Sequence, residues 1–254
     1  MNQVIKDKIK RIRVLDVPVD FVNMSLALRY VEEMVTHNRK GNYILAVNAE
    51  KFMQLRKDLF LKKIFEDASL LLPDGVGAVW ALRWRYRLIT ERVPSVDLMQ
   101  NICKESAEKG YRIFIYGAKE DSNRLAVEKL RDIYPGINIV GRSNGYVSKE
   151  GMQGLIDEIN RSGADILFVA LGSPKQEMWI KEYLPLLNVK VCQGIGGTLD
   201  AITGETKRAP ALFQKLPLEW LYRLIIDPKR IRRQAVIPYF LFKVFTQKRT
   251  TYPS

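Results

Sequence analysis

The chain has 254 residues, of which 47% are hydrophobic and 27% charged, so it is long enough and apolar enough to bury a full globular core. Its two cysteines form no CxxC pair, which argues against a disulfide framework or a zinc site and fits a reducing compartment. The net charge is +13, no apolar region follows the charged N-terminal segment, and no stretch approaches the ~20 apolar residues that span a bilayer, so we expect a soluble or peripheral protein without a signal peptide.

Apolar, β-rich runs alternate with helical patterns over residues 1–207. Tyr43–Val47 and Ile166–Leu171 are continuous apolar runs, which are typical of strands buried on both faces of a parallel sheet. The alternation predicts an α/β core domain over 1–207, with a mostly parallel, Rossmann-like sheet flanked by helices. The predicted strands are Arg13–Val17, Tyr43–Val47, Ser69–Leu72, Arg112–Tyr116, Asn138–Val140, Ile166–Leu171 and Lys190–Gln193. The predicted helices are Ser25–His37, Glu50–Asp67, Val76–Trp84, Ser95–Lys109, Asp121–Tyr134, Lys149–Ser162 and Lys175–Leu184.

The pattern changes at about Arg208, and residues 208–254 are predicted to form a basic helical appendage. Two helices are expected there, Pro217–Ile226 and Pro228–Val244, and Pro238 should kink the second. From Lys207 onward the net charge is +9, which favours a polyanionic partner such as nucleic acid, anionic lipid or a phosphorylated substrate. The second helix fits equally well in a membrane interface or packed on the core with a solvated basic face.

Several predicted strands end in loops rich in Gly or Asp, at the sheet edge where α/β proteins bind ligands. Asp74 follows such a strand in Pro73-Asp74-Gly75. A tripeptide of this kind is more often a simple turn, but its carboxylate can also accept a proton from a substrate hydroxyl. The glycine loop Gly194–Thr198 (GIGGT) precedes a short helical stretch, and its N–H groups are suited to cradle a diphosphate, although glycine-rich turns are common.

The segment Ser173–Glu177 (SPKQE) opens a predicted helix, with Ser173 as its N-cap and Glu177 in its first turn. Capping does not explain Lys175 and Gln176, which can reach a ligand in the same crevice. There is no DxD pair and no Cys/His ligand cluster, so the sequence favours a metal-free mechanism in which arginine meets diphosphate charge. The arginines that adjoin these segments are Arg92, Arg208, Arg223, Arg230 and Arg233.

An ordered set of motifs, spread over nearly the whole chain, resembles the WecG/TagA/CpsF family of glycosyltransferases and is closest in pattern to its TagA branch. The matching stretches are Val47–Glu50, Leu72–Gly77, Glu91–Met99, Tyr116–Ala118, Gly145-Tyr146, Ala164–Trp179, Gly194–Asp200, Lys207–Pro210 and Glu219–Leu224. No single stretch is decisive, but the ordered set is highly specific.

The resemblance implies an inverting, metal-independent transfer, without a cofactor, from a UDP-sugar donor to N-acetylglucosamine linked to undecaprenyl diphosphate. In the TagA branch the donor is UDP-N-acetylmannosamine, and the product is the linkage disaccharide of wall teichoic acid. The resemblance also implies a peripheral protein on the cytoplasmic face of the bacterial cell membrane, and a homo-oligomer in solution.

The site residues that the resemblance implies fall into four groups. Asp74 is the implied general base, and Asn48 lines the same pocket. Arg92 and Gln176 match residues tied to activity or substrate contact. The positions that match the nucleotide-side loop are Gly196, Gly197 and Asp200. The positions that match appendage arginines meeting diphosphate at the membrane are Arg223, Arg230 and Arg233.

The chain departs from the family pattern at two places: Ala46 stands where relatives often have Thr, and Pro94-Ser95 replaces a small residue and Gly. A sister activity therefore stays open, with N-acetylmannosaminuronic acid, glucose or galactose as the sugar, in capsule, exopolysaccharide or common-antigen synthesis. A nucleic-acid-binding protein is the other alternative. The low basic charge of residues 1–206 and the apolar tail helix count against it, so no nucleic-acid partner is expected.

Overall fold

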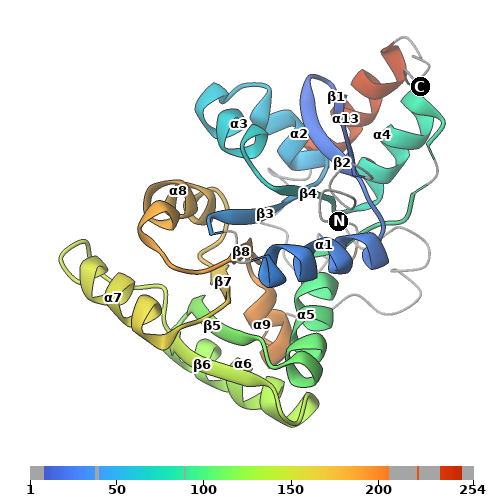
Figure 1. The fold of residues 1–254 in the computed structure, drawn as a ribbon. Coiled ribbons are helices and arrows are strands. Elements are labelled where there is room, and N and C mark those ends of the chain that lie inside the picture. The colour runs from blue at the N-terminus through green and yellow to red at the C-terminus, as the bar shows by residue number, and fades with distance from the viewer. Residues whose placement is uncertain (1–8, 38–39, 89, 206–221, 223–234, 248–254) are drawn as a thin grey trace.

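The computed structural model describes residues 9–37, 40–88, 90–205, 222 and 235–247 (Figure 1). The strands are β1 (Lys10–Val14), β2 (Val17–Phe21), β3 (Asn42–Val47), β4 (Leu70–Pro73), β5 (Arg112–Gly117), β6 (Asn138–Ser143), β7 (Ile166–Ala170) and β8 (Val191–Gly194). The described α-helices are α1 (Met24–Thr36), α2 (Ala49–Leu55), α3 (Leu59–Glu66), α4 (Val76–Tyr86), α5 (Ser95–Lys109), α6 (Glu120–Ile133), α7 (Met152–Ser162), α8 (Lys175–Tyr183), α9 (Thr198–Thr203) and α13 (Val236–Thr246).

The core is a six-stranded parallel sheet with the strand order β4-β3-β8-β7-β5-β6. Helices α2, α3, α7 and α8 cover one face, and α1, α5, α6 and α9 cover the other (Figure 1). Every residue of β7 is buried, as its continuous apolar run predicts. The predicted α/β fold with a mostly parallel sheet is therefore confirmed.

The predicted strand Arg13–Val17 is wrong, because the chain reverses direction inside it. Leu15 and Asp16 both have positive φ, 51° and 64°, and this two-residue turn joins β1 and β2 in an antiparallel hairpin. The hairpin is attached to the main sheet through Asp20, which is 1% exposed. Two nitrogens of Arg11 donate to the Asp20 carboxylate at 2.7 and 2.9 Å, and the Leu71 N–H of β4 donates to it at 2.8 Å.

The single helix predicted over Glu50–Asp67 is two helices, α2 and α3. The break follows Leu55, and Asp58 then caps the second helix by accepting a hydrogen bond from the Leu61 N–H at 2.9 Å. The split turns α2 into a short element that begins directly at the end of β3.

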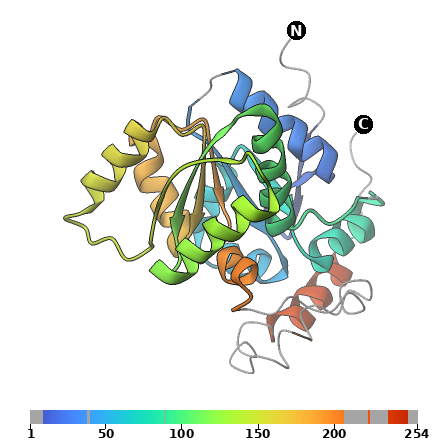
Figure 2. The same ribbon diagram turned by 90° about the horizontal axis from the view of Figure 1, so that it is seen from below.

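Helix α13 packs on the core beside α2 and α4 (Figure 2). Phe240 is fully buried, and its ring stacks on Phe52 of α2 with the centroids 5.2 Å apart. Pro238 lies in the first turn of α13, where proline removes no hydrogen bond, so the predicted kink is wrong for the described helix. The rest of the 208–254 segment, apart from Tyr222, Ala235 and Gln247, lies outside the described residues, and the division of the chain at Arg208 stays a prediction.

No helix within the described ranges combines the length and the apolarity that a membrane crossing requires. The two cysteines, Cys103 and Cys192, are both buried, and neither forms a disulfide. Burial raises the pKa of the Cys103 thiol to about 12, so the thiol stays protonated at neutral pH.

Candidate active site

Asn48 and Asp74 lie side by side at the carboxyl edge of the sheet, because their strands β3 and β4 are neighbours. The Asp74 N–H donates to the Val47 carbonyl at 3.0 Å, which joins the two loops. Gly75 has a φ of +100°, and a Cβ at this position would lie 3.6 Å from the Asn48 Cβ. Asn48 is exposed and Asp74 is half-buried, directly after the carboxyl ends of β3 and β4.

The Asp74 carboxylate is held by the start of α5. The Ser95 N–H, in the first turn of α5, donates to Asp74 Oδ2 at 3.2 Å. Gln193 of β8 fixes Ser95 in turn, since its Nε2 donates to the Ser95 carbonyl at 3.0 Å and to Ser95 Oγ at 3.1 Å. The Ser95 hydroxyl donates to the Gly194 carbonyl at 3.2 Å. Asp74 is thus oriented by contacts that join β4, α5 and β8.

Gln176 holds the glycine loop. It is 7% exposed, and its Oε1 accepts a hydrogen bond from the Gly196 N–H at 2.8 Å. Its Nε2 lies so close to Gly194 that a Cβ there would be 2.9 Å away, which explains the glycine. Gly196 has a φ of +54°, and Gly197 is the exposed N-cap residue of α9. The structure therefore places Gln176 of α8 against the loop that contains Gly196 and Gly197, at the carboxyl end of β8.

Ser173 does not cap α8, so its predicted role is wrong. The N-cap residue is Pro174, and α8 has no side-chain cap. The Ser173 hydroxyl instead accepts a hydrogen bond from the Lys51 ammonium of α2. Glu177 does lie in the first turn of α8, as predicted, but it is only 2% exposed and forms an ion pair with Lys51.

Asp200 lies in the first turn of α9, next to the start of α6. Burial raises the pKa of its carboxyl, the negative charge of Glu205 raises it further, and a hydrogen bond from Ser122 and the charge of Lys119 oppose the rise. The Ser122 hydroxyl, which has a single proton to donate, also lies 2.8 Å from Glu205 Oε1. The arrangement places a partly buried carboxylate just after the glycine loop that follows β8, at some cost to the folded state.

The substitution Asp200→Asn is expected to raise the Tm at about pH 7 by no more than about 3 °C, because the carboxyl is partly exposed and water screens its charge. A carboxyl whose folded pKa lies above its unfolded value destabilises the folded state above the folded pKa and has no such effect below the unfolded value. The gain should therefore vanish below about pH 4. Calorimetry of both proteins over this range checks the prediction, and a Tm at pH 7 below that of the wild type would contradict it.

Arg92 lies in the segment between α4 and α5 and is partly exposed. The N–H of its neighbour Val93 donates to the Pro73 carbonyl at 3.1 Å, so this segment runs beside the end of β4 and near Asp74. The three appendage arginines lie outside the described residues, and their roles stay predictions: Arg223, Arg230 and Arg233. In the part of the chain that the structure describes, no three His, Cys, Asp or Glu side chains gather as metal ligands.

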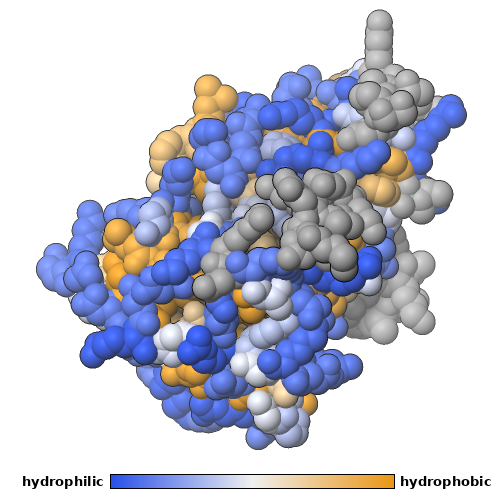
Figure 3. Space-filling view, viewed as in Figure 1, coloured by the Kyte–Doolittle hydropathy of each residue, from blue (hydrophilic) through white to orange (hydrophobic). Residues whose placement is uncertain are grey.

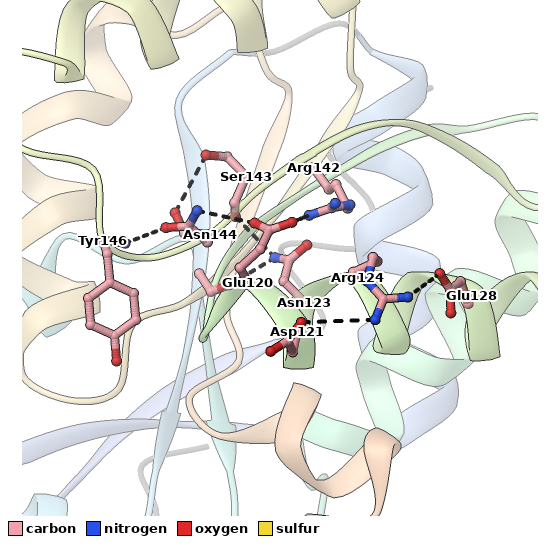
Figure 4. Close-up of polar contacts among 10 residues, drawn as sticks. Glu120, Asp121, Asn123, Arg124, Glu128, Arg142, Ser143, Asn144 and Tyr146 are labelled. Carbon is pink, nitrogen blue, oxygen red and sulfur yellow. Dashed lines mark hydrogen bonds and ion pairs between the residues drawn. The ribbon is translucent and has the colours of Figure 1, made fainter.

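A polar network ties together the carboxyl ends of β5 and β6 (Figure 4). The buried Asn123 of α6 donates to the carbonyls of Gly117 and Ser143 at 2.8 and 3.0 Å. The Tyr146 N–H donates to Asn144 Oδ1 at 2.9 Å. Tyr146 is 74% exposed, and its ring points away from the network. The matched Gly145-Tyr146 motif therefore lies at the same sheet edge as the other motifs.

The sequence analysis did not identify Ser95 and Gln193 as the residues that hold Asp74 in place. It also did not identify the ion pair of Lys51 and Glu177, which joins the start of α2 to the start of α8. A buried Gln in the apolar run of β8 and a buried Lys in α2 are the only sequence signals for them. Both signals are weak, because the burial of these residues follows from tertiary contacts.

A parallel α/β sheet with a carboxylate and a glycine loop at its carboxyl edge suits a transferase of nucleotide-activated groups. The family model described as "Glycosyl transferase WecG/TagA/CpsF family" matches residues 12–254, and the chain belongs to this family. The resemblance drawn from the motifs is confirmed, and the chain is a glycosyltransferase.

Two relatives from bacilli match this chain over more than nine-tenths of both lengths. One, from Bacillus subtilis (strain 168), is 35% identical over 240 residues, which cover 92% of this chain and 93% of the relative. The other, from Bacillus spizizenii, is 32% identical over 235 residues, which cover 92% and 91%. Both are named N-acetylglucosaminyldiphosphoundecaprenol N-acetyl-beta-D-mannosaminyltransferase.

Proposed function

We propose that this protein transfers N-acetylmannosamine from UDP-N-acetylmannosamine to N-acetylglucosaminyl-diphosphoundecaprenol, as a step in making the linkage unit of wall teichoic acid. The observation that carries the proposal is the match to two relatives named for this transfer over more than nine-tenths of the chain. The oriented carboxylate of Asp74 beside the glycine loop supports it, because the reaction needs a base near a group that binds diphosphate.

In the proposed mechanism Asp74 accepts the proton of a hydroxyl on the acceptor sugar. The hydroxyl oxygen forms a bond to the anomeric carbon from the face opposite UDP, and the bond from that carbon to the diphosphate oxygen breaks with its electron pair going to UDP. Attack from the opposite face turns an α-linked donor into a β-linked product. Arginine side chains stabilise the negative charge that develops on the diphosphate, and the Gly197 N–H of the glycine loop donates to it, while the Ile195, Gly196 and Thr198 N–H groups keep their acceptors within the protein.

A donor screen tests this proposal. The purified protein is given lipid-linked N-acetylglucosamine and equal concentrations of four donors: the UDP forms of N-acetylmannosamine, N-acetylmannosaminuronic acid, glucose and galactose. We expect kcat/KM for N-acetylmannosamine to exceed the others by about 10-fold or more, because the site must hydrogen-bond the polar groups that distinguish these sugars. A preference for another donor would identify a sister activity, and transfer of none of them would overturn the proposal.

We also propose that the protein works as a peripheral protein at the cytoplasmic face of the bacterial cell membrane. Helices α4 and α13 form a surface that supports this, with exposed aromatic rings of Trp80, Tyr239 and Phe242. The Phe245 ring packs on Trp80 with the centroids 5.1 Å apart. A cavity of about 250 Å³ in the same surface is lined by Trp80, Arg83, Trp84 and Arg87. Aromatic and basic side chains on one surface are typical of proteins that bind a lipid interface.

The appendage arginines provide a test of the membrane proposal. Replacing Arg223, Arg230 and Arg233 together with Gln is expected to weaken binding to anionic vesicles about 100-fold, since each basic residue near such a surface contributes about 1 kcal/mol. Co-sedimentation with phosphatidylglycerol vesicles at low salt measures this. The matched control replaces three exposed arginines of α6 and α7, namely Arg124, Arg131 and Arg161. Equal losses in both variants, or none in the first, would contradict the proposed docking.

A homo-oligomer in solution is proposed on the family resemblance. One described surface suited to such a contact is an apolar patch at the start of α3, visible in orange in Figure 3, where Leu59 and Phe60 are 75% and 59% exposed. Exposed apolar patches of this kind often mark protein contacts.

A further inference from the structure

Lys51 of α2 is a buried lysine that lies against α8. It is 7% exposed, and its ammonium donates to Gln54 Oε1 at 2.8 Å and to the Ser173 hydroxyl. The same ammonium lies 3.5 Å from Glu177 Oε1 and 5.6 Å from the centroid of the Phe65 ring. Two of its polar partners, Ser173 and Glu177, thus come from the turn before α8 and from the first turn of α8.

The backbone N–H and the side-chain ammonium of Lys51 contact two different parts of the candidate active site. Its backbone N–H donates to Asn48 Oδ1 at 2.9 Å, which engages the amide oxygen and leaves the amide nitrogen to donate to a ligand. Its ammonium holds Ser173 and Glu177, and Glu177 follows Gln176 directly. Gln176 in turn holds the Gly196 N–H at 2.8 Å. One residue therefore connects the loop beside Asp74 to the glycine loop.

Folding alone gives no reason for this buried charge. Glu177 is 2% exposed, and its second carboxylate oxygen has no hydrogen-bond partner among the described residues. A buried ion pair that is incompletely hydrogen-bonded contributes little to stability, and apolar residues of similar size often replace such pairs without loss. The pair does make directional contacts that apolar residues cannot make, and these contacts end at active-site loops.

We propose that Lys51 is a positioning residue: through Asn48 and through Gln176 it sets the separation between the acceptor side of the crevice, at Asp74, and the diphosphate side, at the glycine loop. This inference rests on the proposed function, because it assigns the two sides from the proposed mechanism. The alignment of the two reacting groups is needed at the transition state, and a misplacement of about 1 Å can lower the rate about 100-fold. Loss of the contact should therefore act on kcat more than on KM.

The test uses the single variant Lys51→Met and the double variant Lys51→Met, Glu177→Gln. Both variants remove the ammonium and keep the backbone N–H that donates to Asn48 Oδ1. The single variant leaves a buried unpaired carboxylate and should lose about 10 °C in Tm, whereas the double variant should regain most of that loss. We expect the double variant to bind UDP with the wild-type stoichiometry and to have kcat lowered about 10- to 100-fold, with both KM values within about threefold of wild type.

The matched control is the ion pair of Lys190 and Asp165, whose atoms are 2.9 Å apart next to the amino ends of β8 and β7. The double variant Lys190→Met, Asp165→Asn should lower the Tm but leave kcat unchanged. The inference is overturned if the Lys51, Glu177 double variant keeps the wild-type kcat. It is also overturned if the fall in kcat is matched by an equal fall in the amount of UDP bound per protein molecule. All variants are assayed with the donor that the wild type uses best, so a failure of the N-acetylmannosamine assignment shows separately, in the wild-type donor screen.

Discussion

The substitution Asp74→Asn is expected to lower kcat by about 10²–10⁴-fold while the protein stays folded. An amide has nearly the shape of the carboxylate and can still accept the hydrogen bond that the Ser95 N–H donates at 3.2 Å, so the local structure should survive. The amide cannot accept a proton from the acceptor hydroxyl, so the chemical step should slow. Steady-state turnover with UDP-N-acetylmannosamine and a lipid-linked acceptor measures the effect, and the Tm reports on folding.

A control for Asp74→Asn is Asp58→Asn. Asp58 caps α3, and Asn caps helices as well as Asp does, so this variant should keep both its Tm and its turnover. Near-normal turnover of Asp74→Asn would rule out Asp74 as the general base. A loss of turnover that follows a loss of folded protein would show a structural role instead.

The substitution Phe240→Ala is expected to reduce the free energy of unfolding by about 3–5 kcal/mol. The Phe240 ring is fully buried between α2 and α4, where it stacks on Phe52 and lies within 3.3 Å of a Cβ placed on Gly77. Its removal leaves a cavity that the surrounding helices fill only in part. Urea unfolding of the two proteins measures the difference.

Phe242 provides the comparison, because it lies on the same helix and is 61% exposed. Phe242→Ala should change the free energy of unfolding by less than about 1 kcal/mol. Equal losses for both substitutions would contradict the packing of α13 on the core. The packing also affects experiments on the tail: deleting 208–254 would remove Phe240 and mix lost stability with lost membrane binding, so the arginine substitutions test docking more cleanly.

The parallel sheet was predictable because its strands are apolar runs long enough to be recognised one at a time. The hairpin was not, because its turn is formed by Leu15 and Asp16, and neither is a glycine or asparagine that would signal positive φ. The break between α2 and α3 was missed because apolar residues continue with near-helical spacing on both sides of Asp58.

The positions of Asn48, Asp74 and Gln176 at strand ends were predictable from the residues that follow each apolar run. Their mutual placement was not, because it depends on β8 lying next to β3, far away in the sequence. The contacts that support them join distant residues: Ser95 is 98 positions from Gln193, and Lys51 is 122 positions from Ser173. A single sequence carries no local pattern for such pairs.

The most direct test of the proposed function is the identity and the anomeric configuration of the product made from UDP-N-acetylmannosamine and lipid-linked N-acetylglucosamine. Mass spectrometry and the NMR coupling of the newly linked sugar determine both. The proposed mechanism predicts one N-acetylmannosamine added in β linkage, with inversion. A product with the α configuration, or an acceptor recovered unchanged while the protein transfers another sugar, would contradict it.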